Sequence, residues 1–560
     1  MFGAQFAKAL DSIGSFYFTK EIFDGTYPGY GSSYPDLQGG LGLLFEQASS
    51  RGHKQTTDFG EINFPFTIRN QYTSSITTVK TAVKNKVYMR KYQQDFFKSA
   101  ISNSTKSKIK GYTFGDTYDQ NRNKAFIDKL LLHKIDVYRS DNKYVVPTKQ
   151  PQYRMVQTMF ETYSKYRDSV YYDASAWSVG NFYNMKYKPV TSLKLGTKIT
   201  SKDNLVSVSP VQKSNYAYII DWDDYNAPAA LNFLQANGLT VSSAFKPFTT
   251  KVGSESKSFN YVALVIPVSL QKKDADTVLQ LVQKAQKKYE VPTYGVNSGY
   301  NLKGIDLGSS YVSALKKPKA VMLIGDGVRS YEAGEVWHLL DTRVHMPITK
   351  IPMRNFDRAN LDKYKTMVMV SGNYSFTEKQ QTKIKDWVSK GNTLITIGTA
   401  TKWAIDKKLV KEKLNKPEKD TTATVERKSY IDARENLGKE SVGGIILKVD
   451  IDTTHPLAFG YHDSSIPVYK NNTVWMAPSK NEYATVGKYA ANPHIDGFIT
   501  KKNMEEYLKP SASLVVSKVG SGRVILFADN PNFRGSWYGT NRLFLNALFL
   551  GDKIRVPSRD

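Results

Sequence analysis

The chain has 560 residues, of which 40% are hydrophobic and 23% are charged. A chain of this length is expected to divide into about three globular domains. The absence of cysteine excludes disulfides, iron–sulfur ligation and thiol nucleophiles. The formal net charge of +27 indicates a solvated basic surface that would attract anionic components of a cell envelope. Nucleic acid is not expected as a partner, because the lysines are interleaved with acidic residues along the whole chain.

The first hundred residues are predicted to start with extended and turn-rich pieces. Residues 16–18 are a strand candidate, residues 27–36 form a loop with Gly and Pro at its turns, and residues 42–46 form a short apolar strand. From residue 67, apolar residues recur at intervals of three and four, which predicts a helix to about residue 100. A run of serine and lysine follows, so we place the first domain at residues 1–106.

Strands and helices alternate over residues 107–316, which predicts a middle α/β domain of one or two lobes. The expected strands cover residues 111–114, 135–138, 216–220 and 261–266, and the expected helices cover residues 122–133, 227–237 and 275–288. Gly238 stands directly after the second of these helices, where a helix commonly ends on glycine.

The alternation becomes clearer in residues 317–560. Continuous apolar strands are expected at residues 320–324, 366–370, 393–397, 513–516 and 522–528, with helices at 330–341, at 377–390 and after 540. Such strands joined by amphipathic helices are typical of a parallel sheet with helices on both faces. A stretch rich in lysine and glutamate, residues 411–439, is expected to be an insertion or a long loop. The fold class predicted for the chain is therefore α/β.

Glu46 is the first candidate catalytic residue. It follows an apolar strand and a glycine-rich loop, and from such a position a rigidly held carboxylate can face a cleft as a general base. The alternative is a surface glutamate at the end of a strand. His53 follows closely and would either line the same cleft or lie in an exposed loop.

The surroundings of Glu46 resemble a known family. Residues 27–53, with the run Phe-Glu-Gln-Ala-Ser at 45–49, and residues 64–71 resemble the end of the catalytic domain of M14 zinc carboxypeptidases of the large multidomain bacterial type. The resemblance implies a zinc ion held by two histidines and one glutamate, with a fourth position open for water. Glu46 would take a proton from that water, and the hydroxide would attack a peptide carbonyl.

The resemblance also implies a substrate-covering tyrosine on a mobile loop before the glutamate, for which Tyr27, Tyr30 and Tyr34 are the candidates. The family's zinc ligands precede the glutamate by a long stretch, whereas the first 45 residues here contain no histidine. The chain therefore resembles the C-terminal part of a longer protein. Zinc is expected in that complete protein, while this chain alone is expected to supply no metal ligand and to be inactive.

The C-terminal region carries a second resemblance. Residues 317–338 and 391–399 resemble a class I glutamine-amidotransferase-like domain with a flavodoxin-like parallel sheet, which is appended to some of the same carboxypeptidases. Active members place a cysteine on a tight strand-to-helix turn. Ala400 occupies the expected nucleophile position here, and Thr399 or Thr401 could replace it only with a base that the sequence does not show. This domain is therefore predicted to be non-catalytic.

Two weaker signals remain in the same region. His338 and Asp341 lie three positions apart on a predicted helix, with His345 nearby, a spacing that fits a metal site but is common in structural helix ends. The turns after three strands, at residues 325–327, 371–372 and 398–399, either line a ligand crevice or satisfy turn geometry.

Together these observations predict part of a zinc-dependent metallocarboxypeptidase that hydrolyses peptide bonds at C-termini, with Glu46 as general base. The alternative is a non-catalytic pseudoenzyme that acts as a binding or scaffold protein of the cell envelope. The predicted partners are a peptide or protein substrate and the protein's own N-terminal fragment. An extracytoplasmic location is expected, although residues 1–11 lack the features of a signal peptide.

Overall fold

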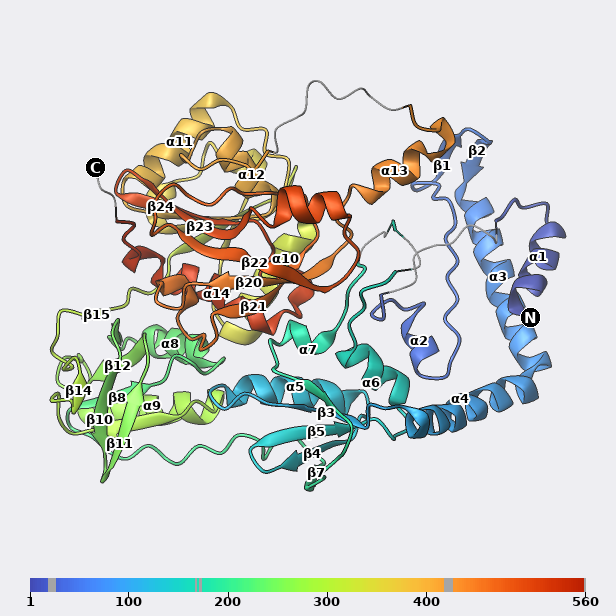
Figure 1. The fold of residues 1–560 in the computed structure, drawn as a ribbon. Helices are drawn as coiled ribbons and strands as arrows, with labels where there is room; N and C mark the ends of the chain where they lie inside the picture. The colour runs from blue at the N-terminus through green and yellow to red at the C-terminus, as the bar shows by residue number, and fades with distance from the viewer. Residues whose placement is uncertain (19–26, 167–168, 171–173, 417–426, 558–560) are drawn as a thin grey trace.

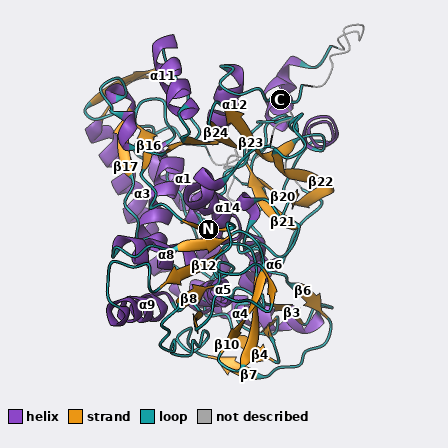
Figure 2. Ribbon diagram, turned by 90° about the vertical axis from the view of Figure 1, so that its left-hand side faces the viewer, coloured by secondary structure: helices purple, strands orange, loops and turns teal. Residues whose placement is uncertain are grey.

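The structure is a computed structural model that describes residues 1–18, 27–166, 169–170, 174–416 and 427–557. The described residues form five β-sheets with helices packed between and around them, which confirms the predicted α/β class. Figure 2 shows the largest sheet in the upper half of the molecule and the sheets formed by residues 111–314 in the lower half.

The N-terminal part contains two long helices and one short hairpin. Its elements are α1 (Phe2–Asp11), α2 (Tyr34–Leu37), β1 (Lys54–Thr57), β2 (Gly60–Asn63), α3 (Phe64–Lys84) and α4 (Lys86–Lys106). The side chain of Asn63 accepts a hydrogen bond from the Phe66 N–H at 2.9 Å and so caps α3. The single helix predicted from residue 67 is divided at Asn85, whose φ and ψ of −110° and 22° are not helical. Residues 16–18 and 42–46, both predicted as strands, form no strand.

The next part is a five-stranded antiparallel sheet in the order β6-β3-β5-β4-β7. Its elements are β3 (Gly111–Phe114), α5 (Gln120–Leu132), β4 (Val137–Ser140), β5 (Lys143–Pro147), α6 (Tyr153–Phe160), α7 (Val179–Phe182), β6 (Lys188–Val190) and β7 (Thr197–Ile199). Phe114, Phe126 and Phe160 pack together between the sheet and the helices. The prediction for residues 111–114 is confirmed, and the predicted strand at 135–138 begins two residues later than expected.

A second five-stranded antiparallel sheet has the order β13-β8-β12-β9-β15, and a three-stranded sheet, β11-β10-β14, lies beside it. The two sheets and the helices between their strands are built from β8 (Ala217–Ile220), α8 (Ala227–Ala236), β9 (Ser242–Ala244), β10 (Phe248–Val252), β11 (Glu255–Phe259), β12 (Ala263–Pro267), α9 (Ala275–Tyr289), β13 (Thr293–Val296), β14 (Lys303–Gly304) and β15 (Val312–Ala314). Gly238 follows α8 with a φ of +80°, so the predicted helix end is confirmed.

The largest sheet has nine strands in the order β17-β16-β18-β19-β24-β23-β22-β20-β21. They are β16 (Ala320–Ile324), β17 (Thr349–Pro352), β18 (Thr366–Met369), β19 (Thr393–Ile397), β20 (Ile445–Ile451), β21 (Ser465–Lys470), β22 (Thr485–Asp496), β23 (Ala512–Val519) and β24 (Gly522–Phe527). The prediction of a parallel sheet is right for β17, β16, β18, β19 and β24 only. The tight turn between Val519 and Gly522 forces β23 and β24 into an antiparallel pair.

Helices follow the parallel strands of this sheet. The longer ones are α10 (Ser330–His338), α11 (Glu378–Ser389), α12 (Thr399–Asp406), α13 (Ala433–Lys439) and α14 (Tyr538–Leu550), and the short turns are η1 (Leu339–Val344), η2 (Met353–Asn355), η3 (Leu361–Lys363), η4 (Tyr430–Asp432), η5 (Pro456–Ala458), η6 (Asn503–Leu508), η7 (Phe533–Gly535) and η8 (Gly551–Lys553). The predicted loop at 411–439 lies partly outside the described residues, and its end forms η4 and α13. Of the helices described, none has both the length and the apolar character needed to cross a membrane.

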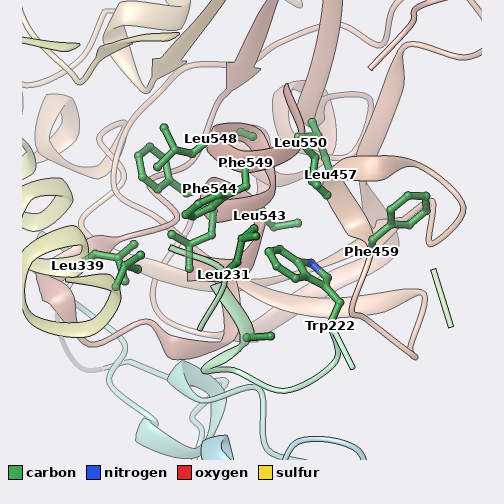
Figure 3. Close-up of a cluster of buried hydrophobic side chains, with 14 of the residues drawn as sticks. Trp222, Leu231, Leu339, Leu457, Phe459, Leu543, Phe544, Leu548, Phe549 and Leu550 are labelled. Carbon is green, nitrogen blue, oxygen red and sulfur yellow. The ribbon is translucent and has the colours of Figure 1, made fainter. Parts of the chain in front are cut away.

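Helix α14 joins the nine-stranded sheet to the middle of the chain. Every residue from Gly539 to Leu550 is buried, and Figure 3 shows Phe544 and Phe549 of this helix beside Trp222 and Leu231. The indole N–H of Trp222 donates a hydrogen bond to Asn546 Oδ1 at 2.9 Å. This shared core holds the turn after Trp222 rigidly against the nine-stranded part.

Candidate acid–base site

Glu46 lies in an exposed, extended segment outside any described sheet. Residues 41–50 form neither helix nor strand, and the Glu46 side chain is exposed. Residues 43–50 make no backbone-to-backbone hydrogen bond with any described residue. The strand predicted at 42–46 is wrong as a sheet element, because an extended backbone becomes part of a sheet only when a neighbouring strand pairs with it.

The three candidate tyrosines are held by different partners. The Tyr27 ring lies 4.0 Å from the guanidinium of Arg534, and the Tyr30 ring packs against Tyr27 edge-on at 5.2 Å. The Tyr34 hydroxyl instead bonds to His133 Nδ1 at 2.9 Å. Two of the tyrosines therefore dock on the C-terminal part of the chain and the third on the end of α5.

The histidines that the sequence singled out have structural contacts. His345 Nδ1 lies 3.1 Å from the carbonyl oxygen of Asp341, where η1 ends. His338 packs against Gly535, and His53 is exposed on the turn before β1. Within the part of the chain that the structure describes, no group of three or more His, Asp or Glu side chains is placed to hold a metal ion.

The sharp turn from β19 into α12 has the position of a nucleophile elbow, the tight strand-to-helix turn that carries the nucleophile in some α/β enzymes. A glycine occupies this position here. Gly398 adopts φ 57° and ψ −121°, a backbone conformation that costs a non-glycine residue about 1–3 kcal/mol. A Cβ at this position would lie 2.2 Å from Ser371 Oγ. Ala400, the predicted nucleophile position, is instead buried in the first turn of α12. The assignment to Ala400 is therefore wrong by two residues, since the elbow residue is Gly398.

The polar groups around this elbow bond to one another. The Thr399 N–H donates to Ser371 Oγ at 3.2 Å, and the Gly372 N–H donates to Thr399 Oγ1 at 2.8 Å. The hydroxyl of Thr401 is buried and donates to the Phe527 carbonyl at 2.8 Å. Neither threonine bonds to a base within the described part of the chain, which leaves both without the activation that a replacement nucleophile needs.

A cluster that the sequence did not reveal lies where three parts of the chain meet. Its acidic residues follow β8, at Asp221, Asp223 and Asp224, and precede α5, at Asp116 and Asp119. His462 reaches it from the turn between η5 and β21. Figure 1 shows α5 and α8 beneath the nine-stranded sheet, which brings these three segments together.

The closest contact in this cluster joins an aspartate and a histidine. Asp223 is 5% exposed, and its Oδ2 lies 2.5 Å from Nε2 of His462. The Tyr118 ring stacks on the His462 ring with 3.5 Å between centroids and 9° between planes. Burial favours the neutral imidazole, but the hydrogen bond to Asp223 and its negative charge outweigh burial and raise the pKa of His462.

The neighbouring carboxyls are shifted strongly by burial. Burial, followed by the charge of Asp223, raises the pKa of half-buried Asp221 to about 6. Burial and the nearby Asp119 raise the pKa of Asp224 to about 8. Asn121 donates its amide to both oxygens of Asp224, at 3.0 and 2.8 Å, and so fixes that carboxyl in the interior.

One oxygen of the central aspartate is left without a partner. Asp223 Oδ1 is buried and accepts no hydrogen bond from any described residue. Arg542 satisfies the backbone of the same turn by donating to the carbonyls of Asp223 and Asp224, at 3.2 and 2.7 Å. A buried carboxylate oxygen without a donor is costly, and such groups cluster at functional sites.

The sequence contained one usable signal for this cluster. Asp221, Asp223 and Asp224 directly follow a fully buried strand, where functional carboxylates are common. His462 carried no comparable signal, because its partner lies 239 positions earlier in the chain. Only the shared core around α14 brings the two residues together.

Comparison with known proteins identifies no family for this chain, since neither the protein-family models nor the curated proteins include a match. Among solved structures, a protein assigned to a GMP synthase, from Thermoplasma acidophilum, covers 41% of this chain and 94% of its own, at 11% identity and a TM-score of 0.26. A protein assigned as ThuA-like from Parabacteroides merdae covers 44% and 93%, at 12% identity and a TM-score of 0.30.

A β-galactosidase from Bacillus circulans sp. alkalophilus covers 49% of this chain, at 12% identity and a TM-score of 0.24. This chain spans only 34% of that enzyme's length. Similarity of this extent carries no argument about the activity of this chain.

No metallocarboxypeptidase appears among these neighbours, and the predicted carboxypeptidase function is wrong, together with its zinc chemistry. The pseudoenzyme alternative depended on the same family and loses its support. The physical reason lies in the N-terminal segment. The resemblance rested on Glu46, which stays in solvent, and on a short apolar run that pairs with no strand among the described residues.

Proposed function

We propose that this chain carries a general acid–base site for hydrolysis, in which His462 is the base, Asp223 positions it, and Asp221 is the proton donor. The observation that carries the proposal is the 2.5 Å contact between buried Asp223 and His462. A buried carboxylate that binds one ring nitrogen fixes the tautomer and the orientation of the imidazole.

The geometry leaves the second ring nitrogen of His462 for chemistry. Because Nε2 donates to Asp223 Oδ2, the lone pair of the neutral ring is on Nδ1. That nitrogen can take a proton from a water molecule, and the negative charge of Asp223 stabilises the imidazolium that forms. The base is available at pH values above the raised pKa of His462.

Asp221 supplies the complementary proton. Its pKa of about 6 leaves a fraction of the carboxyl protonated near neutral pH. Two acid–base groups whose environments move their pKa values from the ordinary range are typical of a paired acid and base. In ester hydrolysis the water oxygen adds to the carbonyl carbon and the bond to the leaving oxygen breaks. His462 accepts the water proton, and Asp221 protonates the leaving oxygen.

The surroundings select a neutral or cationic substrate. The carboxyls of Asp116 and Asp221 both act on His462 electrostatically and would repel an anion. Tyr118 is 58% exposed, so the face of its ring that does not stack on His462 offers an apolar platform for a substrate. A neutral ester fits these conditions.

We also propose that residues 317–560 form an amidotransferase-like domain that is non-catalytic at its elbow. The strand-to-helix turn at Gly398 supports the first part, and the missing side chain at Gly398 supports the second.

The test measures hydrolysis of the neutral probe 4-nitrophenyl acetate as a function of pH. We expect a bell-shaped profile for the wild type, because neutral His462 and protonated Asp221 are both required. His462→Gln is expected to lower the rate above buffer by about a hundredfold. His53→Gln, which changes an exposed histidine, is the matched control and should leave the rate unchanged.

Asp223→Asn separates a positioning role from a merely structural one. It removes a charge that raises the pKa values of both His462 and Asp221, so both limbs of the profile should move to lower pH. Equal losses in His462→Gln and His53→Gln, or an unmoved limb in Asp223→Asn, would refute the proposed site.

A further inference from the structure

A cavity of about 550 Å³ lies at one end of the sheet that contains β8 and β13. It is lined by Lys213, Asn215, Tyr216 and Asn297. Tyr216 directly precedes β8 and Asn297 directly follows β13, and these two strands pair in antiparallel register. Asp221 of the acid–base site follows the other end of β8, about 16 Å from Tyr216 along an extended strand. The cavity is therefore a second candidate site, separate from the first.

The buried hydroxyl of Ser214 holds one wall of this cavity in place. Ser214 is 2% exposed, and its Oγ donates to the Val296 carbonyl at 2.6 Å and accepts from the Tyr216 N–H at 3.0 Å. On the other side, the Val268 N–H donates to the Tyr216 carbonyl at 2.8 Å. The backbone that carries Asn215 and Tyr216 is thus bound to neighbouring segments on both sides. A cavity that is already formed spares a ligand the entropic cost of ordering its walls.

The ring of Tyr216 is positioned by its contact with Gly299. A Cβ at residue 299 would lie 1.9 Å from Tyr216 Oη and 2.7 Å from its Cζ, so any side chain there would displace the ring. The Leu307 N–H donates to the Gly299 carbonyl at 3.0 Å and fixes this loop. The Tyr216 side chain is 42% exposed, so a ring held in one orientation presents apolar surface to the cavity.

The polar groups of the lining are left for a ligand. The amides of Asn215 and Asn297 and the hydroxyl of Tyr216 make no hydrogen bond with any residue that the structure describes. Each amide has two N–H donors and an acceptor oxygen. The single cation of the lining, Lys213, is paired with Asp276 at 2.7 Å. Groups that both donate and accept, beside a cation that is already paired, match the hydroxyls of a neutral polyol better than a carboxylate or a phosphate.

We propose that this cavity binds one unit of a neutral glycan, with the Tyr216 ring stacked on a pyranose and the amides of Asn215 and Asn297 bonded to its hydroxyls. A pyranose with equatorial substituents presents a face of C–H groups, which suits the electron-rich face of an aromatic ring. The volume is in the range of roughly 300–1,000 Å³ that is usual for ligand sites. The cavity is open to solvent, so the sugar units on either side of the bound one can extend beyond it. The proposal does not depend on the hydrolytic role of His462.

The test uses cellohexaose, a neutral chain of β-linked glucose units whose ring substituents are all equatorial. Binding to the full chain is measured by NMR as saturation transfer from the protein to the sugar protons, and the Kd is obtained by titration. With one ring and two amides as contacts, we expect a Kd of about 1 mM. Transfer should be strongest to the C–H protons on one face of the sugar, because that face lies on Tyr216.

Three substitutions change the cavity in different ways. Tyr216→Ala removes the ring and Asn297→Leu removes an amide at similar volume, and each should raise the Kd by about tenfold. Gly299→Ala keeps every lining side chain but displaces the Tyr216 ring, so it should weaken binding as well. Thermal melting of each variant checks that the chain remains folded.

Two control variants leave the cavity intact. Tyr331→Ala removes a tyrosine that is 87% exposed on α10, and it should bind cellohexaose as the wild type does. His462→Gln should also bind the sugar normally, because His462 lies at the other site.

Four results would overturn the proposal. The first is no saturation transfer from the wild type at about 5 mM cellohexaose, a concentration well above the expected Kd. The second is equal binding by Tyr216→Ala and the wild type, which would place the sugar elsewhere on the surface. The third is loss of binding in His462→Gln, which would place the sugar in the acid–base site. The fourth is tighter binding of hexagalacturonate, whose units carry carboxylates, which would make the cavity a site for anions.

Discussion

Substituting Gly398 by alanine measures how much strain the turn between β19 and α12 imposes. At φ 57° and ψ −121° the backbone strain alone costs a residue with a Cβ about 1–3 kcal/mol of stability. The new Cβ would lie 2.2 Å from Ser371 Oγ, so that hydroxyl must rotate away and lose its bond to the Thr399 N–H. The lost hydrogen bond adds about 1 kcal/mol, for a total destabilisation of about 2–4 kcal/mol.

The assay is urea unfolding followed by tryptophan fluorescence, because Trp403 lies on α12 directly after the turn. A double-mutant cycle with Ser371→Ala separates the two contributions. Without the hydroxyl, the nearest atom of residue 371 to the new Cβ is its own Cβ, at 3.6 Å. The double variant should therefore lose about 1 kcal/mol less than the sum of the single variants.

Two results would contradict this reasoning. Gly398→Ala with a stability within about 0.5 kcal/mol of wild type would show that the elbow is not strained. Strict additivity of the two substitutions would show that the Ser371 hydroxyl does not oppose a side chain at position 398.

Two further substitutions test buried charges. Lys470 is fully buried and paired with Asp529 at 3.2 Å, so Lys470→Met should lower the free energy of unfolding by about 3–5 kcal/mol in urea titrations. Lys402→Met, which removes a solvent-exposed pair, is the control and should change it by less than about 0.5 kcal/mol. Burial raises the pKa of Asp224 from 3.8 to about 8, so the native state binds more protons than the unfolded state in that window and stability falls as pH rises through it. Asp224→Asn should flatten this fall in the melting temperature between about pH 5 and 8, and an unchanged slope would contradict the assignment.

Much of the secondary structure could be predicted from local pattern. The strands at 320–324 and 393–397 match the structure, because their continuous apolar residues have no other way to be buried. The helix at 275–288 matches α9 to within one residue, since Asp274 caps its start. The direction of β23 was not predictable from apolar pattern, because it depends on the turn at residues 519–522.

The strand expected at 42–46 failed for a different reason. Its residues before Glu46 are apolar, as a strand of this kind requires, yet strand formation depends on a partner strand elsewhere in the sequence or on another molecule. The same limit applies to Glu46, whose predicted role depended on a cleft around it. A local resemblance describes the residues near a position and not what packs against them.

The sequence by itself determined the α/β class, most of the longer helices, a minority of the strands, and the absence of a thiol nucleophile, because these depend on composition and on short-range periodicity. Only the tertiary structure decided that Gly398 occupies the elbow. It also decided that Asp223 meets His462. These features depend on contacts between residues far apart in the chain, and such contacts form only when the shared core around α14 assembles.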